Sequence, residues 1–384
     1  MMSLKGLIPC LAALLLMASC KKDEGNEPVP TAAAPSYQLF NGYIGTSDNS
    51  TLVTGDDNLL ICGTTELGFS LLKVTKAGSQ LWRKDLDADP GGNAIGVAQT
   101  ADQAVFLCSI TARNYAAAQM DILLVKTDPN GDTLWTRTYG GSESDYGRQV
   151  IATADGNVLI AGTTESFGAG PFGDILLIKV NTDGDTLWTR SYPDPDQETA
   201  FHLLETQNGE YLVTGTNESG GPRELYLLKV GADGGLLWSR TIGPGWKWGY
   251  SSIELPNGDL VTCGQRTTNG YAQVLLVKTN NLGSVIWERE FGDATLSEKG
   301  YSVKGDTDGG FTITGESYEV IAQHTTILLL KVDAEGEQAY LKRFGSTTSR
   351  GMNLIKDANG DNLITGNYQD QIFLTRTDSD GTFK

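Results

Sequence analysis

Carboxylates close to aromatic rings and arginines are the side chains of this sequence with the clearest chemical potential. Asp145 and Glu198 stand in neighbouring repeats of the chain, and Glu298 stands in a similar place further on. Two carboxyl groups that share a site could act as acid and base on a polysaccharide. Rings beside arginines could instead bind a sugar or anchor a partner protein.

The aromatic and arginine residues gather where several similar segments begin. In "GPGWKWGY" at 243–250, Trp246 and Trp248 are the only tryptophans outside a repeated position. The predicted ligand-binding residues are Tyr146, Arg148, Trp246, Trp248, Tyr250, Tyr301 and Arg350. Polar residues follow them closely in the sequence: Gln149, His202, Ser251, Ser302 and Asn353. The alternative is that the rings, Phe201 included, pack between repeats and the polar side chains line a hydrated channel.

Other potential sites have a simpler interpretation. The turns "DPNGD" at 128–132 and "NTDGD" at 181–185 lack the ligand number of a calcium loop and fit hairpins stabilised by Asx side chains. The only histidines, His202 and His324, are too far apart in sequence for a metal motif. We therefore predict no catalytic residue, no metal site and no cofactor. The remaining cysteines form no CxxC pair and are expected to be small core residues: Cys62, Cys108 and Cys263.

A repeated pattern of about fifty residues must position these side chains. The hexapeptide "DTLWTR" occurs at 132–137 and again at 185–190. A basic residue ends an apolar run in seven units: Lys73, Lys126, Lys179, Lys229, Lys278, Lys331 and Arg376. A large aromatic follows nine residues later in six of them and is expected to wedge between neighbouring units: Trp82, Trp135, Trp188, Trp238, Trp287 and Tyr340. Internal repeats of this length are typical of radial or solenoid folds.

Each unit has the pattern of four short strands. In the third unit, "RQVIATADG" and "NVLIAGTT" predict a hairpin with an Asp-Gly turn. The unbroken apolar run "DILLIKV" predicts a strand buried on both faces, and "NTDGDTLWTRSY" adds a turn and a fourth strand. The sequence therefore predicts an all-β fold, a seven-bladed β-propeller with four-stranded antiparallel blades. The longer loops are expected on one side of the disc, the favoured recognition surface.

The ends of the chain predict how the ring closes. The last unit stops at Lys384, before its fourth strand, whereas "SYQLFNGYIG" at 36–45 is a spare strand. Tyr37 stands 45 residues before Trp82 and is expected to take the aromatic position of the last unit. The N-terminal strand should then complete the last blade and remove an exposed edge. The predicted propeller domain spans residues 37–384.

The first residues resemble the processing signal of a bacterial lipoprotein. An apolar run from Leu7 to Met17 predicts a signal peptide over residues 1–19. "LMASC" resembles a lipobox, with Met17 at the usual Leu position, and implies that Cys20 carries the lipid, palmitate included. "KKDE" at 21–24 is similar to the export signal of Bacteroidota surface lipoproteins and implies an outer-membrane, cell-surface location. Residues 20–36 then form a flexible tether.

The repeat itself resembles two propeller families. "KTDPNGDTLW" and "KVNTDGDTLW" are similar to the tryptophan-docking repeats of PQQ-like propellers and to the Asp-box turns of sialidase-like propellers. The resemblance implies the fold. The chain has no adjacent cysteine pair of the kind that caps the cofactor in catalytic PQQ-like members, so no quinone is expected.

The acidic composition of the chain narrows the classes of partner that it can bind. The chain has 47 acidic and 29 basic residues and a net charge of −18, which disfavours nucleic acid as a partner. The leading hypothesis is a monomeric, non-enzymatic binding or scaffold module for a glycan or an outer-membrane or cell-surface protein, touching the membrane only through its lipid. The alternative is a propeller hydrolase or lyase that acts on polysaccharide through carboxylates at the channel mouth.

Overall fold

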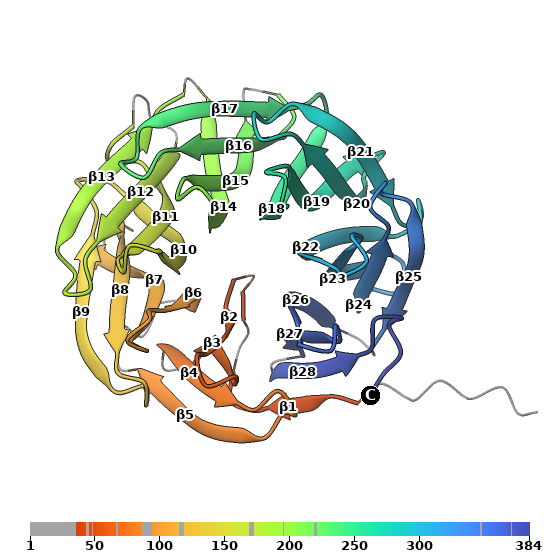
Figure 1. Ribbon diagram of the computed structural model, residues 1–384, viewed down its shortest axis with the longest axis horizontal. Helices are drawn as coiled ribbons and strands as arrows, with labels where there is room; N and C mark the ends of the chain where they lie inside the picture. Colours follow the sequence, from red (N-terminus) through yellow and green to blue (C-terminus); the bar gives the residue numbers. More distant parts are fainter. Residues whose placement is uncertain are drawn as a thin grey trace, which may run out of the picture. The chain divides into compact units, whose positions relative to one another are not determined.

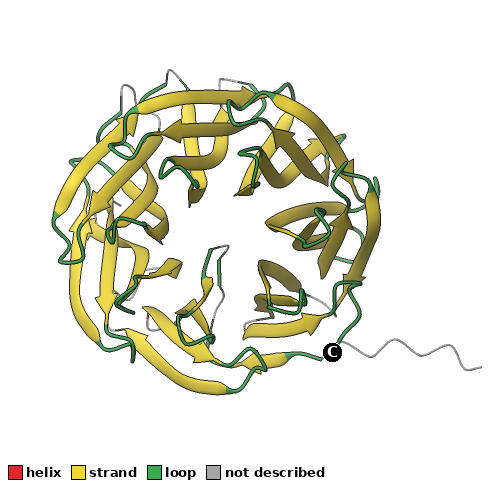
Figure 2. Ribbon diagram, viewed as in Figure 1, coloured by secondary structure: helices red, strands yellow, loops and turns green. Residues whose placement is uncertain are grey.

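The computed structural model describes residues 36–384 except 44–45, 48, 67, 87–93, 115–118, 169–172, 195, 219–220, 346–347 and 370. The predicted signal peptide, Cys20 and the tether up to residue 35 lie outside the described residues. Every regular element in the described ranges is a β-strand, as Figure 2 shows. That part of the chain has no helix of the length and apolarity that a membrane crossing requires.

Seven four-stranded sheets stand in a ring as the blades of a β-propeller (Figure 1). This confirms the predicted fold class. Blades 1 to 3 comprise β2 (Thr51–Val53), β3 (Leu59–Thr65), β4 (Gly68–Val74) and β5 (Gln80–Leu86); β6 (Ala94–Gln99), β7 (Val105–Asn114), β8 (Gln119–Thr127) and β9 (Thr133–Tyr139); β10 (Asp145–Ala152), β11 (Val158–Thr164), β12 (Asp174–Val180) and β13 (Thr186–Tyr192).

Blades 4 to 7 continue around the same ring. They comprise β14 (Gln197–Glu205), β15 (Tyr211–Glu218), β16 (Glu224–Val230) and β17 (Leu236–Ile242); β18 (Trp246–Glu254), β19 (Leu260–Thr268), β20 (Tyr271–Thr279) and β21 (Val285–Phe291); β22 (Ser297–Gly305), β23 (Phe311–Glu319), β24 (His324–Val332) and β25 (Gln338–Phe344); β26 (Ser349–Lys356), β27 (Asn362–Tyr368) and β28 (Gln371–Thr377) with β1 (Gln38–Phe40).

The turns within each blade are stabilised by their own polar side chains. In blade 3 the Thr153 hydroxyl donates to Asp155 Oδ1 at 2.6 Å, and the Gly156 N–H donates to the Thr153 carbonyl at 2.9 Å. In blade 2 the Asp128 carboxylate accepts the N–H groups of Asn130 and Asp132 at 2.8 and 2.9 Å. These are the Asx hairpins expected from the sequence.

Antiparallel order gives the disc two different sides. The turns between first and second strands, and between third and fourth strands, lie on one side, which we call the tight-turn face. The connections between second and third strands, and from blade to blade, lie on the other side, the long-loop face. The third strands supply the core between the faces. All seven residues of β12 are buried, as the unbroken apolar run predicted.

The repeated basic and aromatic residues form cross-strand pairs on the outer two strands. Lys179 lies opposite Trp188 in the β12–β13 ladder, and the pairing recurs in the other blades that carry a complete repeat. The outer edge of each of these aromatic side chains then contacts the turn that follows the third strand of the next blade. A Cβ built on Gly184, whose φ is +83°, would stand 2.9 Å from Trp135. The backbone of a glycine is therefore in direct contact with the indole of the preceding blade.

The last blade closes with the N-terminal strand, as predicted, but Tyr37 does not take the aromatic position. Gln38 pairs with Leu374 and Phe40 with Ile372, a register that sets Ser36 opposite Arg376. Because side chains alternate along a strand, Tyr37 points to the other face and packs on Phe373, with ring centroids 5.6 Å apart. Gln38 instead contacts the turn at Gly78 of blade 1.

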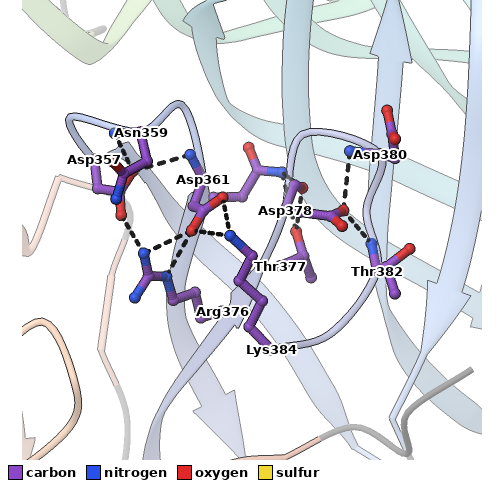
Figure 3. A network of polar contacts seen from close by, with 10 residues as sticks. Asp357, Asn359, Asp361, Arg376, Thr377, Asp378, Asp380, Thr382 and Lys384 are labelled. Carbon is purple, nitrogen blue, oxygen red and sulfur yellow. Dashed lines mark hydrogen bonds and ion pairs between the residues drawn. The ribbon is translucent and has the colours of Figure 1, made fainter.

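The basic residue of each repeat is held by an acid or a carbonyl near the tight-turn face. The last blade shows the fullest network (Figure 3): Arg376 binds Asp361 through Nε at 3.0 Å and Asp357 through Nη2 at 2.5 Å. Lys384 Nζ also binds Asp361 Oδ2, at 2.6 Å. These basic residues are thus structural, as expected, but Lys179 and Lys229 are buried, whereas solvated side-chain ends were expected.

Candidate functional site

Inner strands of the propeller carry a β-bulge that turns one side chain to the axis. The ladder shifts between Gly147 and Gln149 in β10, and the same shift recurs in the inner strands of blades 2 and 4 to 7. The bulged residues are Ile95, Arg148, Phe201, Tyr250, Tyr301 and Met352. A bulge adds one residue to one strand and redirects its side chains. Period-two reasoning from the sequence does not reveal it.

Four of these bulged side chains contact one another in order around the axis. The Arg148 guanidinium lies 5.9 Å from the Phe201 centroid. The rings of Phe201 and Tyr250 meet edge to face with centroids 5.3 Å apart, and those of Tyr250 and Tyr301 lie tilted at 5.4 Å. Burial and nearby Glu316 raise the pKa of Tyr301 well above its ordinary value. Arg148, Tyr250 and Tyr301, predicted as ligand-binding residues, therefore come together, but they pack against one another as the alternative interpretation expected.

The polar residues that follow the bulges join neighbouring blades. Gln149 Oε1 accepts the N–H of Leu203 in the next blade, and His202 Nδ1 accepts that of Ser252 at 3.4 Å. Ser302 Oγ accepts the N–H of Leu354 at 3.3 Å in the same way. A buried N–H without a partner is costly, so these side chains stabilise the bulged strands of the ring.

A cavity of about 680 Å³ lies along the axis next to these polar residues. Its lining includes His202, Ser251 and Asn353, and it extends to Gly55 and Gln103 in hairpin turns of the tight-turn face. None of the six bulge residues named above lines this cavity. Asn49, which precedes β2 of blade 1, does line it. This axial cavity thus lies towards the tight-turn face of the propeller.

The three carboxylates are enclosed in separate hydrogen-bond networks. Asp145 Oδ2 accepts from Gly141 N and Ser166 Oγ, both at 2.7 Å. Glu198 Oε1 accepts from Asn217 at 2.6 Å, and burial together with Asp194 and Asp174 raises the pKa of Glu198 to about 8. The Glu298 carboxylate binds Arg343 at 2.6 and 2.9 Å.

These networks bear on the polysaccharide-cleaving alternative. Asp145, Glu198 and Glu298 are each fully buried, at 0% exposure. The described hydrogen-bond partners of Asp145 are Gly141 and Ser166 in loops, whereas Glu198 binds Asn217 directly opposite it on β15, so no partner is common to the two carboxylates. Glu198 and Glu298 are each held within their own blade, by Asn217 and by Arg343 of β25. In the part of the chain that is described, no cluster of three or more His, Cys, Asp or Glu side chains could hold a metal ion.

The predicted tryptophan pair forms an aromatic platform apart from the axial rings. Trp246 and Trp248 stack with centroids 6.1 Å apart and planes at 23°. Trp246 is 46% exposed at the start of β18, and the Arg223 guanidinium from blade 4 lies 5.9 Å from the Trp248 centroid. Arg223 is in turn held by Glu218 at 2.8 Å. Sequence reasoning missed Arg223, because only the β15–β16 connection brings it to the next blade.

The other two predicted binding residues lie elsewhere. Arg350 is 53% exposed at the start of β26, where its Nε pairs with the buried Glu316 at 2.8 Å. Tyr146 is half-buried opposite Thr163. The free thiols of Cys62, Cys108 and Cys263 are buried in the core, as expected for small packing residues.

Comparison with known proteins supports the fold and leaves the activity open. No known protein family matches the chain. Regulatory protein FlaEY of Caulobacter vibrioides is 23% identical over 234 residues, which are 50% of this chain and 24% of that protein. The chain therefore spans about a quarter of the length of this curated relative.

Solved structures with the same fold include enzymes and binding proteins. An ulvan lyase of polysaccharide lyase family 25, bound to -[GlcA(1-4)Rha3S]-, matches with a TM-score of 0.58 and 11% identity, over 90% of this chain and 97% of that one. A puromycin hydrolase variant matches at 0.59 and 11%, over 91% and 56%. Drosophila Plexin A in complex with Semaphorin 1b matches at 0.54 and 9%, over 90% and 87%. At such identities the likeness shows the fold alone.

Proposed function

We propose that the chain is a non-enzymatic binding module that holds a glycan at its long-loop face. The observation that carries the proposal is the stacked pair of Trp246 and Trp248, with Trp246 46% exposed. A soluble protein that leaves a large indole half in water does so most simply where a partner covers it. The two rings already hold each other in place by stacking, so little ordering entropy is lost on binding.

A sugar suits this platform by its shape and chemistry. The C–H face of a pyranose packs on an indole, while its hydroxyls accept from a guanidinium such as that of Arg223, 5.9 Å from the Trp248 centroid. The position of Arg223 is fixed by its pair with Glu218 at 2.8 Å. Cleavage of a polysaccharide would also need acids open to the substrate, whereas Asp145 and Glu198 are at 0% exposure. Binding is therefore favoured over catalysis.

We further propose that a lipid on Cys20 tethers the domain to the cell-surface side of the outer membrane. The strand β1 starts near the tight-turn face, where the Thr375 hydroxyl donates to the Ser36 carbonyl at 2.8 Å. A chain that continues upstream of Ser36 therefore leaves the domain on the side opposite the long-loop face.

Binding to a panel of bacterial and host glycans, measured with Trp246→Ala and Trp248→Ala, tests the proposal. Each substitution should weaken the affinity for a glycan that the wild-type protein binds by about fivefold or more, because a central ring contact carries about 1–3 kcal/mol. Trp246→Ala should leave the melting temperature within a degree or two, since nearly half of the residue is exposed at the start of β18. Phe167→Ala is the matched control, as another exposed ring, at 41%. Unchanged affinity in both tryptophan variants would refute the site, and binding of a protein but no glycan would refute the ligand class.

A further inference from the structure

We propose that the axial cavity is a second binding site, for a small hydroxyl-rich monoanion of the sugar-acid class whose carboxylate is held by Lys304. The cavity measures about 680 Å³, within the usual range for small-molecule pockets. It extends to the tight-turn face, so this site is separate from the tryptophan platform. The inference does not rest on the proposed function.

Lys304 interrupts a strict apolar column of the repeat. It stands two residues after the polar residue that follows the bulge, Ser302. The same place in the other six inner strands is aliphatic: Leu52, Ala98, Ile151, Leu204, Ile253 and Ile355. The fold therefore accepts an apolar side chain at this place in six blades and does not itself require a lysine. An alignment of the seven repeat units shows Lys304 as the exception at this position. A search for clusters of reactive residues does not find it, because it stands alone.

The ammonium of Lys304 has no hydrogen-bond or ion-pair partner among the described residues, unlike two lysines of the same region of the ring. Lys356, on the next inner strand, is bound to Asp306, and Lys331 binds Asp308 at 2.7 Å. Lys304 is partly buried against the cavity wall, and burial lowers its pKa. An unpaired charge in such a place costs free energy, which an anion in the cavity would offset.

The cavity wall offers hydrogen bonds to a hydroxylated ligand and a single positive charge. Lys304 is the only Asp, Glu, Lys or Arg among the described residues that line it. His202 Nδ1 accepts the Ser252 N–H, which leaves its Nε2 as a donor. Burial and the charge of Lys304 lower the pKa of His202 to about 3, so the ring is neutral at pH 7. Amide groups complete the polar wall: Asn49, Gln99, Gln103, Gln149 and Asn353. Of these, Asn353 Nδ2 already donates to the Ser47 carbonyl and to Ser50 Oγ.

This combination favours a carboxylate over a phosphate. Phosphate sites usually present several cations or a bidentate arginine, because the ligand carries nearly two charges. One lysine with neutral amide and imidazole donors matches one negative charge among hydroxyls. The aliphatic lining, which includes Leu52, Val97 and Leu354, would pack on the C–H groups of a sugar ring.

Titration calorimetry with glucuronate and galacturonate, against glucose and inorganic phosphate, tests the site in the mature protein. A sugar acid should bind at least tenfold more tightly than glucose, and Lys304→Leu should abolish that preference. Because Leu occupies this place in blades 1 and 4, the variant should be as stable as the wild type or more stable. Lys84→Met is the matched control, since Lys84 pairs with Asp132 on the surface and should not affect binding. Trp246→Ala should also leave this binding unchanged, which separates the two proposals.

Several outcomes would overturn the inference. Absence of binding by either sugar acid refutes it, and binding of phosphate alone refutes the ligand class. If Lys304→Leu fails to fold, lysine-methyl NMR on the reductively methylated wild-type protein gives the answer. A resonance with a depressed pKa should then shift to a higher pKa when glucuronate is added. A resonance unmoved by saturating glucuronate would refute a carboxylate partner.

Discussion

Replacing Gly184 by Ala should destabilise the propeller through a contact made between two blades. Gly184 lies in the turn after β12 with φ at +83°, and an added Cβ would stand 2.9 Å from Trp135 and 3.0 Å from Arg137 Nε of the preceding blade. The left-handed backbone alone costs an L-residue roughly 1–2 kcal/mol. Displacing a packed ring adds about 1–3 kcal/mol. The free energy of unfolding should therefore fall by about 2–5 kcal/mol.

Gly156→Ala in the same blade supplies the matched control. Its φ is +80°, but a Cβ there would meet nothing within 4 Å, so only the backbone cost of about 1–2 kcal/mol applies. Urea unfolding followed by tryptophan fluorescence, with far-UV circular dichroism as a second probe, measures both variants. In a Trp135→Ala background the two glycine substitutions should become equally costly. Equal costs in the wild-type background would refute the role of the ring contact.

Two further predictions concern buried charges. The pKa of Glu198 is raised to about 8 in the folded state, whereas the unfolded chain loses this proton near the ordinary value of 4.5. The free energy of unfolding should therefore fall as the pH rises from about 4.5 to 8. Urea titrations at several pH values should show a flatter pH dependence for Glu198→Gln. A slope unchanged in the variant would assign the effect to other groups. Arg343→Met should cost about 3 kcal/mol, because it leaves Glu298 buried without its partner. The double variant Arg343→Met with Glu298→Gln should recover much of that loss, and equal stability of the double and single variants would contradict the pairing.

The repeat made most of the architecture predictable. A basic and an aromatic residue nine positions apart indicate two strands joined by a tight turn, and Lys179 indeed faces Trp188. The hairpin chemistry of the Asx turns is local and was equally visible. Ring closure followed from counting strands. The prediction that Tyr37 takes the aromatic position of the last blade was wrong by one residue. It was based on the aromatic side chain, whereas the position is set by the strand register, which places Ser36 opposite Arg376.

The candidate sites were less predictable, for physical reasons. A bulge reverses the alternation of a strand, so Tyr250 points to the axis and meets Phe201, whereas the sequence suggested an open face. Asp145 pairs with Ser166 of the β11–β12 connection, and Glu198 pairs with Asn217 on the neighbouring strand, contacts that only the folded chain makes. Lys304 was visible in principle, since a single lysine in an aliphatic column needs only the alignment of the seven units.

The short closing strand also has a mechanical consequence. If the chain is anchored through the residues ahead of Ser36, any drag on the domain enters the fold at β1, whose ladder with β28 extends only from Gln38 to Phe40. The pull acts along the strand, so its hydrogen bonds are loaded together in shear and do not peel apart one by one. The seam between the two ends of the chain would then set the force at which the ring opens, while the six blades made from continuous chain remain intact.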